Sequence, residues 1–157
     1  MWAYTTSAKK ENEFIFSLAN TMLGRMHLSD DFENLDNGLK KHLNDAVELY
    51  KSYRHIMSDC AVKHHSGLYY LYKNNEKVIS YELRSKDNTE SVILVERTES
   101  PDSSFTVKVE GLQEGIYSLD YFPYKSSVTM TAEELANGLS FELPQEYTAW
   151  VVYIHKS

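Results

Sequence analysis

Two neighbouring aspartates, Asp30 and Asp31, are the first carboxylates whose spacing suggests catalysis. A carboxylate pair can divide nucleophilic attack and proton donation between its members only when both groups face the same bond. Adjacent side chains on an extended chain point to opposite sides. We therefore expect Asp30 and Asp31 to cap a loop or face solvent, and we expect no catalytic pair at this position.

A second adjacent pair, His64 and His65, raises the question of a metal site. Zinc needs ligands that converge at suitable spacing, and no matching Cys or His pair stands nearby in the sequence. Cys60 is the one cysteine and has no identifiable base partner that would activate it as a nucleophile. We expect no metal and no cofactor, and we interpret the two histidines as part of a linker.

Length and charge limit the classes of protein that this chain can represent. Its 157 residues suit one ordinary domain or two small ones, and they exclude a complete (β/α)8 barrel of roughly 250 residues. The formal net charge of −7 disfavours nucleic acid and anionic membranes as partners. No stretch approaches the roughly 20 apolar residues that span a bilayer. A single cysteine fits a reducing compartment, so we expect a cytoplasmic protein.

The first part of the chain has the pattern of two helices around a short strand. Apolar residues repeat every three to four positions over 8–23, which predicts a helix with one buried face. Polar and apolar residues alternate over 25–29, which predicts a strand. A second amphipathic helix then begins at a cap formed by Asp36 or Asn37 and fades near residue 59.

The second part of the chain changes to short alternating segments separated by turn residues. Eight such segments indicate an antiparallel β-sandwich: 68–73, 77–84, 91–98, 104–110, 115–122, 127–131, 139–143 and 148–155. We interpret 60–67 as the connection, and we predict an α+β protein. Its domains would be 1–62, a helix–strand–helix portion, and 63–157, the sandwich.

One stretch of this pattern resembles a known family. The segment 20–57 carries Gly24-Arg25, then His27-Leu28-Ser29, and a helix that ends in Tyr50-Lys51-x-x-Arg54. It is similar to the last βα unit of the catalytic barrel in microbial α-galactosidases, or melibiases. The segment 131–144 is similar to the end of the C-terminal domain in the same family.

The resemblance implies a retaining glycosidase that uses two aspartates on earlier barrel strands, within motifs that this sequence lacks. It implies that the chain is the C-terminal, non-catalytic part of such an enzyme and is inactive alone, with a sandwich that buttresses the barrel. The implied partners are the remainder of the barrel and an α-galactoside sugar, and the implied assembly is a homo-oligomer. No metal or organic cofactor is implied.

The resemblance also nominates residues for sugar contact. Active sites of such barrels lie at the C-terminal ends of the strands, where Ser29 and Asp30 would follow the last strand and Trp2 and Tyr4 would follow the preceding one. Aromatic faces stack on sugar rings, and hydroxyl or carboxylate groups bind sugar hydroxyls. We therefore predict these four residues as substrate-binding.

Two other interpretations of the sequence remain open. The chain contains 12 Tyr, 6 Phe and 2 Trp, and a carbohydrate-binding β-sandwich module would expose such residues in a row on one face. Core and cross-strand packing explains most of them, since aromatic residues are favoured in strands. The second alternative is a free-standing interaction domain, in which the two helices dock on a partner.

Overall fold

The computed structural model describes residues 2–3, 10–29, 32–66 and 78–157. Its first elements are β1 (Trp2–Ala3), α1 (Glu11–Thr21), β2 (His27–Leu28), the 3-10 turn η1 (Phe32–Asn34), α2 (Asn37–Tyr53) and the 3-10 turn η2 (Arg54–Ser58). There follow β3 (Cys60–His64), β4 (Val78–Ser85), β5 (Glu90–Arg97), β6 (Ser104–Val107) and β7 (Ile116–Phe122). The last elements are β8 (Ser127–Thr131), α3 (Ala132–Asn137), β9 (Leu139–Glu142) and β10 (Thr148–Lys156).

Helix α2 begins where the sequence predicts it. The Asp36 side chain accepts a hydrogen bond from the Leu39 amide at 2.9 Å, which satisfies one of the amides left without a partner in the first turn. Helix α1 starts at Glu11, later than expected, and residues 8–9 of the predicted helix lie outside the described chain.

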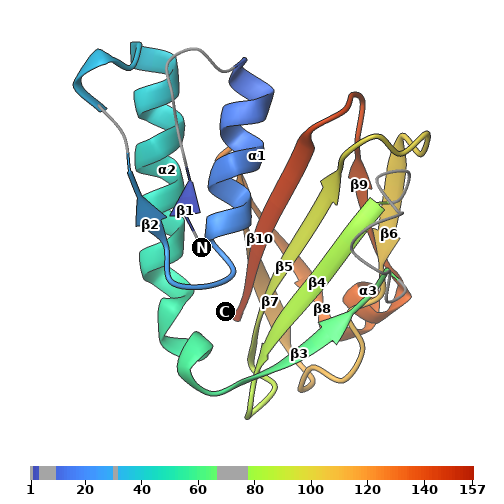
Figure 1. Ribbon diagram of the computed structural model, residues 1–157. Helices are drawn as coiled ribbons and strands as arrows, with labels where there is room; N and C mark the ends of the chain where they lie inside the picture. The colour runs from blue at the N-terminus through green and yellow to red at the C-terminus, as the bar shows by residue number, and fades with distance from the viewer. Residues whose placement is uncertain (1, 4–9, 30–31, 67–77) are drawn as a thin grey trace.

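Strands β1 and β2 are parallel neighbours, with Trp2 opposite His27 and Ala3 opposite Leu28. The sequence predicted only one strand here and placed Trp2 after a strand, whereas Trp2 lies within β1. The order β1–α1–β2–α2 therefore contains two consecutive βα units (Figure 1). A parallel pair joined through a helix is the repeating unit of α/β barrels.

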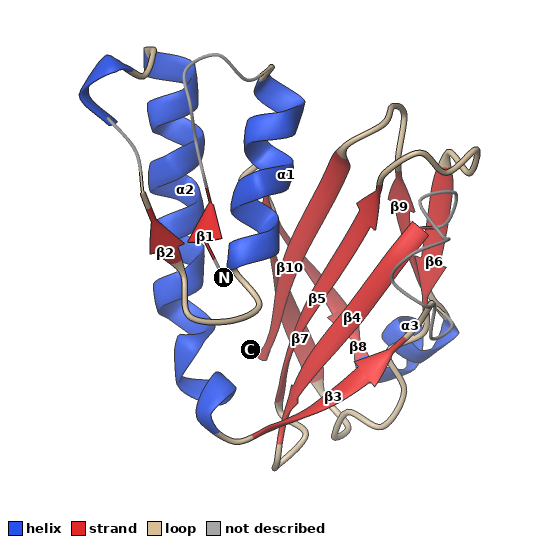
Figure 2. Cartoon of the chain, in the orientation of Figure 1, coloured by secondary structure: helices blue, strands red, loops and turns tan. Residues whose placement is uncertain are grey.

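Six strands form one antiparallel sheet in the order β3-β4-β5-β10-β7-β8, and β6 pairs with β9 in a second, two-stranded sheet. Helices α1 and α2 cover one face of the large sheet, while α3 and the small sheet lie on the other (Figure 2). The α+β class and the antiparallel strands are confirmed. Residues 60–64, interpreted as part of a connection, instead form edge strand β3.

Two apolar clusters hold these layers together. The first joins the buried face of α1, including Phe14 and Leu18, to Leu94, Val151 and other residues of the sheet. The second joins the opposite face of the sheet to the small sheet and α3. Because α1 also contacts β1, this helix is packed between the parallel pair and the antiparallel sheet. Among the described residues, no helix is long and apolar enough to cross a membrane.

Candidate functional site

The edge predicted to contact sugar lies where the chain leaves β1 and β2. Because these strands are parallel and in register, their carboxyl ends meet at the same edge. Ser29 follows β2 directly and is half-buried. Tyr4 and Asp30 lie outside the described residues, so the sugar contacts of all four nominated residues, Trp2 included, stay a prediction.

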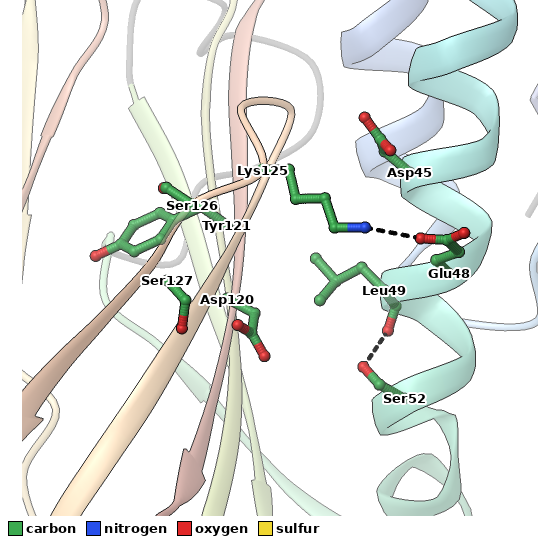
Figure 3. A pocket seen from close by; sticks show the side chains of 9 residues that line it. All are labelled: Asp45, Glu48, Leu49, Ser52, Asp120, Tyr121, Lys125, Ser126 and Ser127. Carbon is green, nitrogen blue, oxygen red and sulfur yellow. Dashed lines mark hydrogen bonds and ion pairs between the residues drawn. The ribbon is translucent and has the colours of Figure 1, made fainter.

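A second candidate is an acidic pocket of about 350 Å³ between α2 and the β7–β8 hairpin (Figure 3). Three carboxylates line it, two from α2 and one from β7, with a single lysine from the hairpin turn. The lining residues are Asp45, Glu48, Leu49, Ser52, Asp120, Tyr121, Lys125, Ser126 and Ser127.

Each carboxylate of this acidic pocket already has a basic partner. Lys125 binds Glu48 at 2.9 Å, an interaction that raises the pKa of Lys125. Asp45 binds Lys41 at 2.7 Å, and Asp120 lies 3.0 Å from the His155 imidazole. A general acid or base needs a carboxyl that is available to substrate. The pocket therefore resembles a polar contact between helix and hairpin more than a catalytic centre.

A buried polar cluster lies on the other face of the sheet. The fully buried Glu82 carboxylate contacts Arg84, accepts a hydrogen bond from Ser91 at 2.8 Å, and lies 2.6 Å from the His65 imidazole. Burial alone would raise the pKa of Glu82, but the His65 hydrogen bond and the Arg84 charge outweigh it and lower that pKa. Arg84 also donates to the Glu110 carbonyl at 2.9 Å.

Sequence analysis missed this cluster and placed His65 in a linker. The available signal was the alternation in β4, where Glu82 and Arg84 share a face with the buried Val78. Charged residues on a buried face imply partners. In the described ranges, no group of three or more His, Cys, Asp or Glu side chains is arranged to hold a metal.

One buried carboxylate is incompletely paired. Glu96 is 6% exposed, on the face of β5 that also carries Val92 and Leu94 toward the helices. Its Oε2 atom has no hydrogen-bond partner among the residues that the structure describes. Burial raises the pKa of Glu96 to about 7, although a hydrogen bond with Asn20 of α1 opposes the shift.

Another cavity, of about 150 Å³, lies where the start of β10 meets α1, and it is called the aromatic pocket below. Its lining combines aromatic, proline and uncharged polar residues with one carboxylate: Asn12, Ile15, Pro123, Tyr124, Glu142, Pro144, Gln145, Tyr147, Thr148, Ala149 and Trp150. The sequence predicts a core position for Trp150. The indole does pack against the apolar cluster, but it is only half-buried.

No family model matches the sequence, and no curated protein matches it. Solved structures do match. The chain superposes on AgaA, a GH36 alpha-galactosidase from Geobacillus stearothermophilus, with a TM-score of 0.65 and 14% identity over 90% of this chain and 19% of that chain. AgaB from the same organism superposes with a TM-score of 0.64 and 14% identity, over 100% of this chain and 21% of that chain.

The fold is that of part of a GH36 alpha-galactosidase. The alpha-galactosidase from Lactobacillus brevis gives the same picture, with a TM-score of 0.64 and 14% identity over 88% of this chain and 19% of that chain. The chain thus spans about a fifth of the length of the solved structures that it matches. The resemblance drawn from 20–57 therefore agrees with the three-dimensional likeness to GH36 alpha-galactosidases.

Proposed function

We propose that this chain is the C-terminal, non-catalytic part of an α-galactosidase-like retaining glycoside hydrolase. In this proposal the antiparallel sheet buttresses two units of the catalytic barrel. The observation that carries it is the position of α1, which contacts β1 on one side and packs on β10 on the other. A helix of a barrel is thereby held against the sheet, which is the arrangement that a buttress requires.

The parallel pair supports a barrel that is completed by further strands. β1 and β2 contain two residues each, and parallel sheets occur almost only where both faces are covered. A barrel of this type closes with eight strands. The remaining strands would come from the rest of the catalytic barrel, which is the chief partner in this proposal.

The substrate of the parent enzyme would be an α-galactoside. Variants of AgaA have been crystallised with raffinose and with stachyose, and the fold likeness to AgaA supports the same class of sugar here. The two catalytic aspartates would reside in the remainder of the barrel, because the carboxylates of the acidic pocket are occupied by basic partners. Trp2, Tyr4, Ser29 and Asp30 would border the sugar.

The test is to read the coding DNA upstream of Met1 and to express what it encodes. We expect it to encode the other barrel units, and we expect hydrolysis of 4-nitrophenyl α-D-galactoside only when both parts are present. Each part alone should be inactive. Absence of barrel-coding sequence, or hydrolysis by the 157-residue chain alone, would overturn the proposal.

A further inference from the structure

We infer that the aromatic pocket is a non-catalytic binding site for one ring of a neutral oligosaccharide. The inference concerns the chain itself and does not depend on a catalytic barrel. A sugar ring has an apolar face that stacks on aromatic side chains and a periphery of hydroxyls that needs polar partners. The pocket offers both kinds of group at one place.

The first wall of the pocket is a fixed indole beside an uncovered phenol. The Trp150 Nε1–H donates to the Glu142 carbonyl at 2.8 Å, so the polar atom of the indole is satisfied and its ring remains for apolar contact. The Tyr124 ring lies 5.5 Å from the Trp150 ring and is 64% exposed. An exposed phenol against a half-buried indole forms an aromatic surface open to a ligand.

The second wall is held by the loop before β10. Tyr147 has φ of 58°, a left-handed conformation that is uncommon for a bulky residue and concentrates at functional sites. Phe16 of α1 packs edge-on to the Tyr147 ring at 5.6 Å. Asn12 fixes the same loop, because its amide donates to the Glu146 carbonyl at 3.0 Å.

The polar lining and the size of the pocket select the ligand. Glu142 is the only charged residue among the lining residues, and Gln145 beside it is exposed. A carboxylate accepts hydrogen bonds from hydroxyls and repels anions, so a neutral polyhydroxylated ligand suits the site. At about 150 Å³ the pocket is smaller than the roughly 300–1,000 Å³ of sites for drug-sized ligands, so it takes a single ring.

A proline-rich peptide is the competing occupant, because aromatic-lined grooves also bind such segments. Those peptides are extended helices that need a continuous groove, whereas this pocket is one ring-sized depression. Its position also favours sugar. Asn12 lies in the first turn of α1, the helix that follows the carboxyl end of β1, so the pocket and the predicted sugar edge lie toward the same end of the molecule.

The test is a titration of the 15N-labelled 157-residue chain followed by the indole N–H resonance of Trp150. Trp2 supplies the second indole, and Trp2→Phe assigns the two signals. Melibiose, maltose and cellobiose are added up to about 100 mM, where a site of millimolar affinity saturates. We expect a saturable shift of the Trp150 signal with at least one of these sugars.

Tyr124→Ala should raise the dissociation constant about three- to ten-fold, the size expected for loss of one aromatic contact. Ile116→Ala is the matched control, because Ile116 is similarly exposed at 56% and lies at the other end of β7; it should leave the affinity unchanged. No saturable shift with any of the sugars would overturn the inference. So would equal affinity in Tyr124→Ala, an equal shift with acyclic sorbitol, or tighter binding of a proline-rich peptide.

Discussion

The Tyr53 hydroxyl donates a hydrogen bond to the backbone carbonyl of Met22 at 2.8 Å. Tyr53 is the last residue of α2, and Met22 caps the end of α1. Both residues are fully buried, and burial holds the pKa of Tyr53 well above its usual value, so the phenol stays protonated as a donor. This single bond joins the C-terminal ends of the two helices over the sheet.

We predict that Tyr53→Phe lowers the free energy of unfolding by about 1–3 kcal/mol, because it leaves a buried carbonyl without a partner. Chemical denaturation monitored by circular dichroism measures the change. Tyr124→Phe removes a hydroxyl from an exposed ring and is the matched control, with no expected effect. Equal stability of Tyr53→Phe and the parent chain would show that water replaces the phenol.

Glu96 should make the protein less stable as the pH rises from about 4.5 to 7. Its pKa in the folded state is raised to about 7, so the folded chain binds the extra proton across this window and the unfolded chain does not. Glu96→Gln should therefore stabilise the protein at pH 8 by up to about 3 kcal/mol and by little at pH 5.

Denaturation of both proteins at pH 5 and pH 8 measures this difference. All other ionisable residues are the same in both proteins, so the comparison isolates Glu96. Ser127→Ala, a substitution of an exposed residue on β8, is the control. Its free energy of unfolding should equal that of the parent chain at both pH values. A stability gap that does not change with pH would contradict the prediction.

Glu82→Gln should destabilise the fold by about 3–5 kcal/mol, because it leaves the buried Arg84 without its counter-charge. Glu114→Gln, the same chemical change at an exposed residue before β7, provides the control. The melting temperatures of the two variants measure the effect. If Glu82→Gln and Glu114→Gln melt at the same temperature, then the Glu110 carbonyl compensates Arg84 sufficiently.

Leu18→Ala should cost about 2–5 kcal/mol, because Leu18 is fully buried between α1 and the sheet. Leu43→Ala should cost less, since Leu43 of α2 is only half-buried against the same cluster. Urea denaturation of both variants shows which one loses more free energy of unfolding. A larger loss for Leu43→Ala would mean that α2, rather than α1, carries the contact with the sheet.

The isolated chain should associate into dimers or larger species. Short parallel strands with unpaired edges recruit other chains, and β2 is the only strand paired with β1 among the described residues. The apolar face of α1 packs on the sheet and does not contribute to this association. Sedimentation at low micromolar concentration measures the state, and a monomer would show that the parallel pair is sufficiently protected.

Alternation predicted most strands of the second half well, because each has one face in a core. Strand β5 was expected at 91–98 and lies at Glu90–Arg97, and β8 matches its expected range of 127–131. The sequence also carries a start signal for α3 at Ala132–Asn137, the capping box formed by Thr131 and Glu134. The candidate strand 68–73 lies outside the described residues.

The misses share a physical cause. Four of the five residues of β3 are exposed, so this strand has no buried face and no apolar alternation, and its pairing with β4 alone defines it. The pairing of β1 with β2 rests on two residues in each strand, too few for any periodicity. The core position of Trp150 was predicted only from the strand face that it shares with Val152 and Ile154. In the structure the indole lies at the edge of the small sheet, where its neighbours Glu142 and Tyr124 leave it partly exposed.

The strand order has a consequence for how this protein is made. β10, at Thr148–Lys156, does not add to an edge of the large sheet but lies at its centre, between β5 and β7, beneath α1. The two halves of the sheet therefore stay separate, and α1 lacks its contacts with β10, until these late residues emerge during synthesis. A premature stop codon a few positions before Thr148 would thus yield a product without its middle strand, exposed to aggregation and proteolysis.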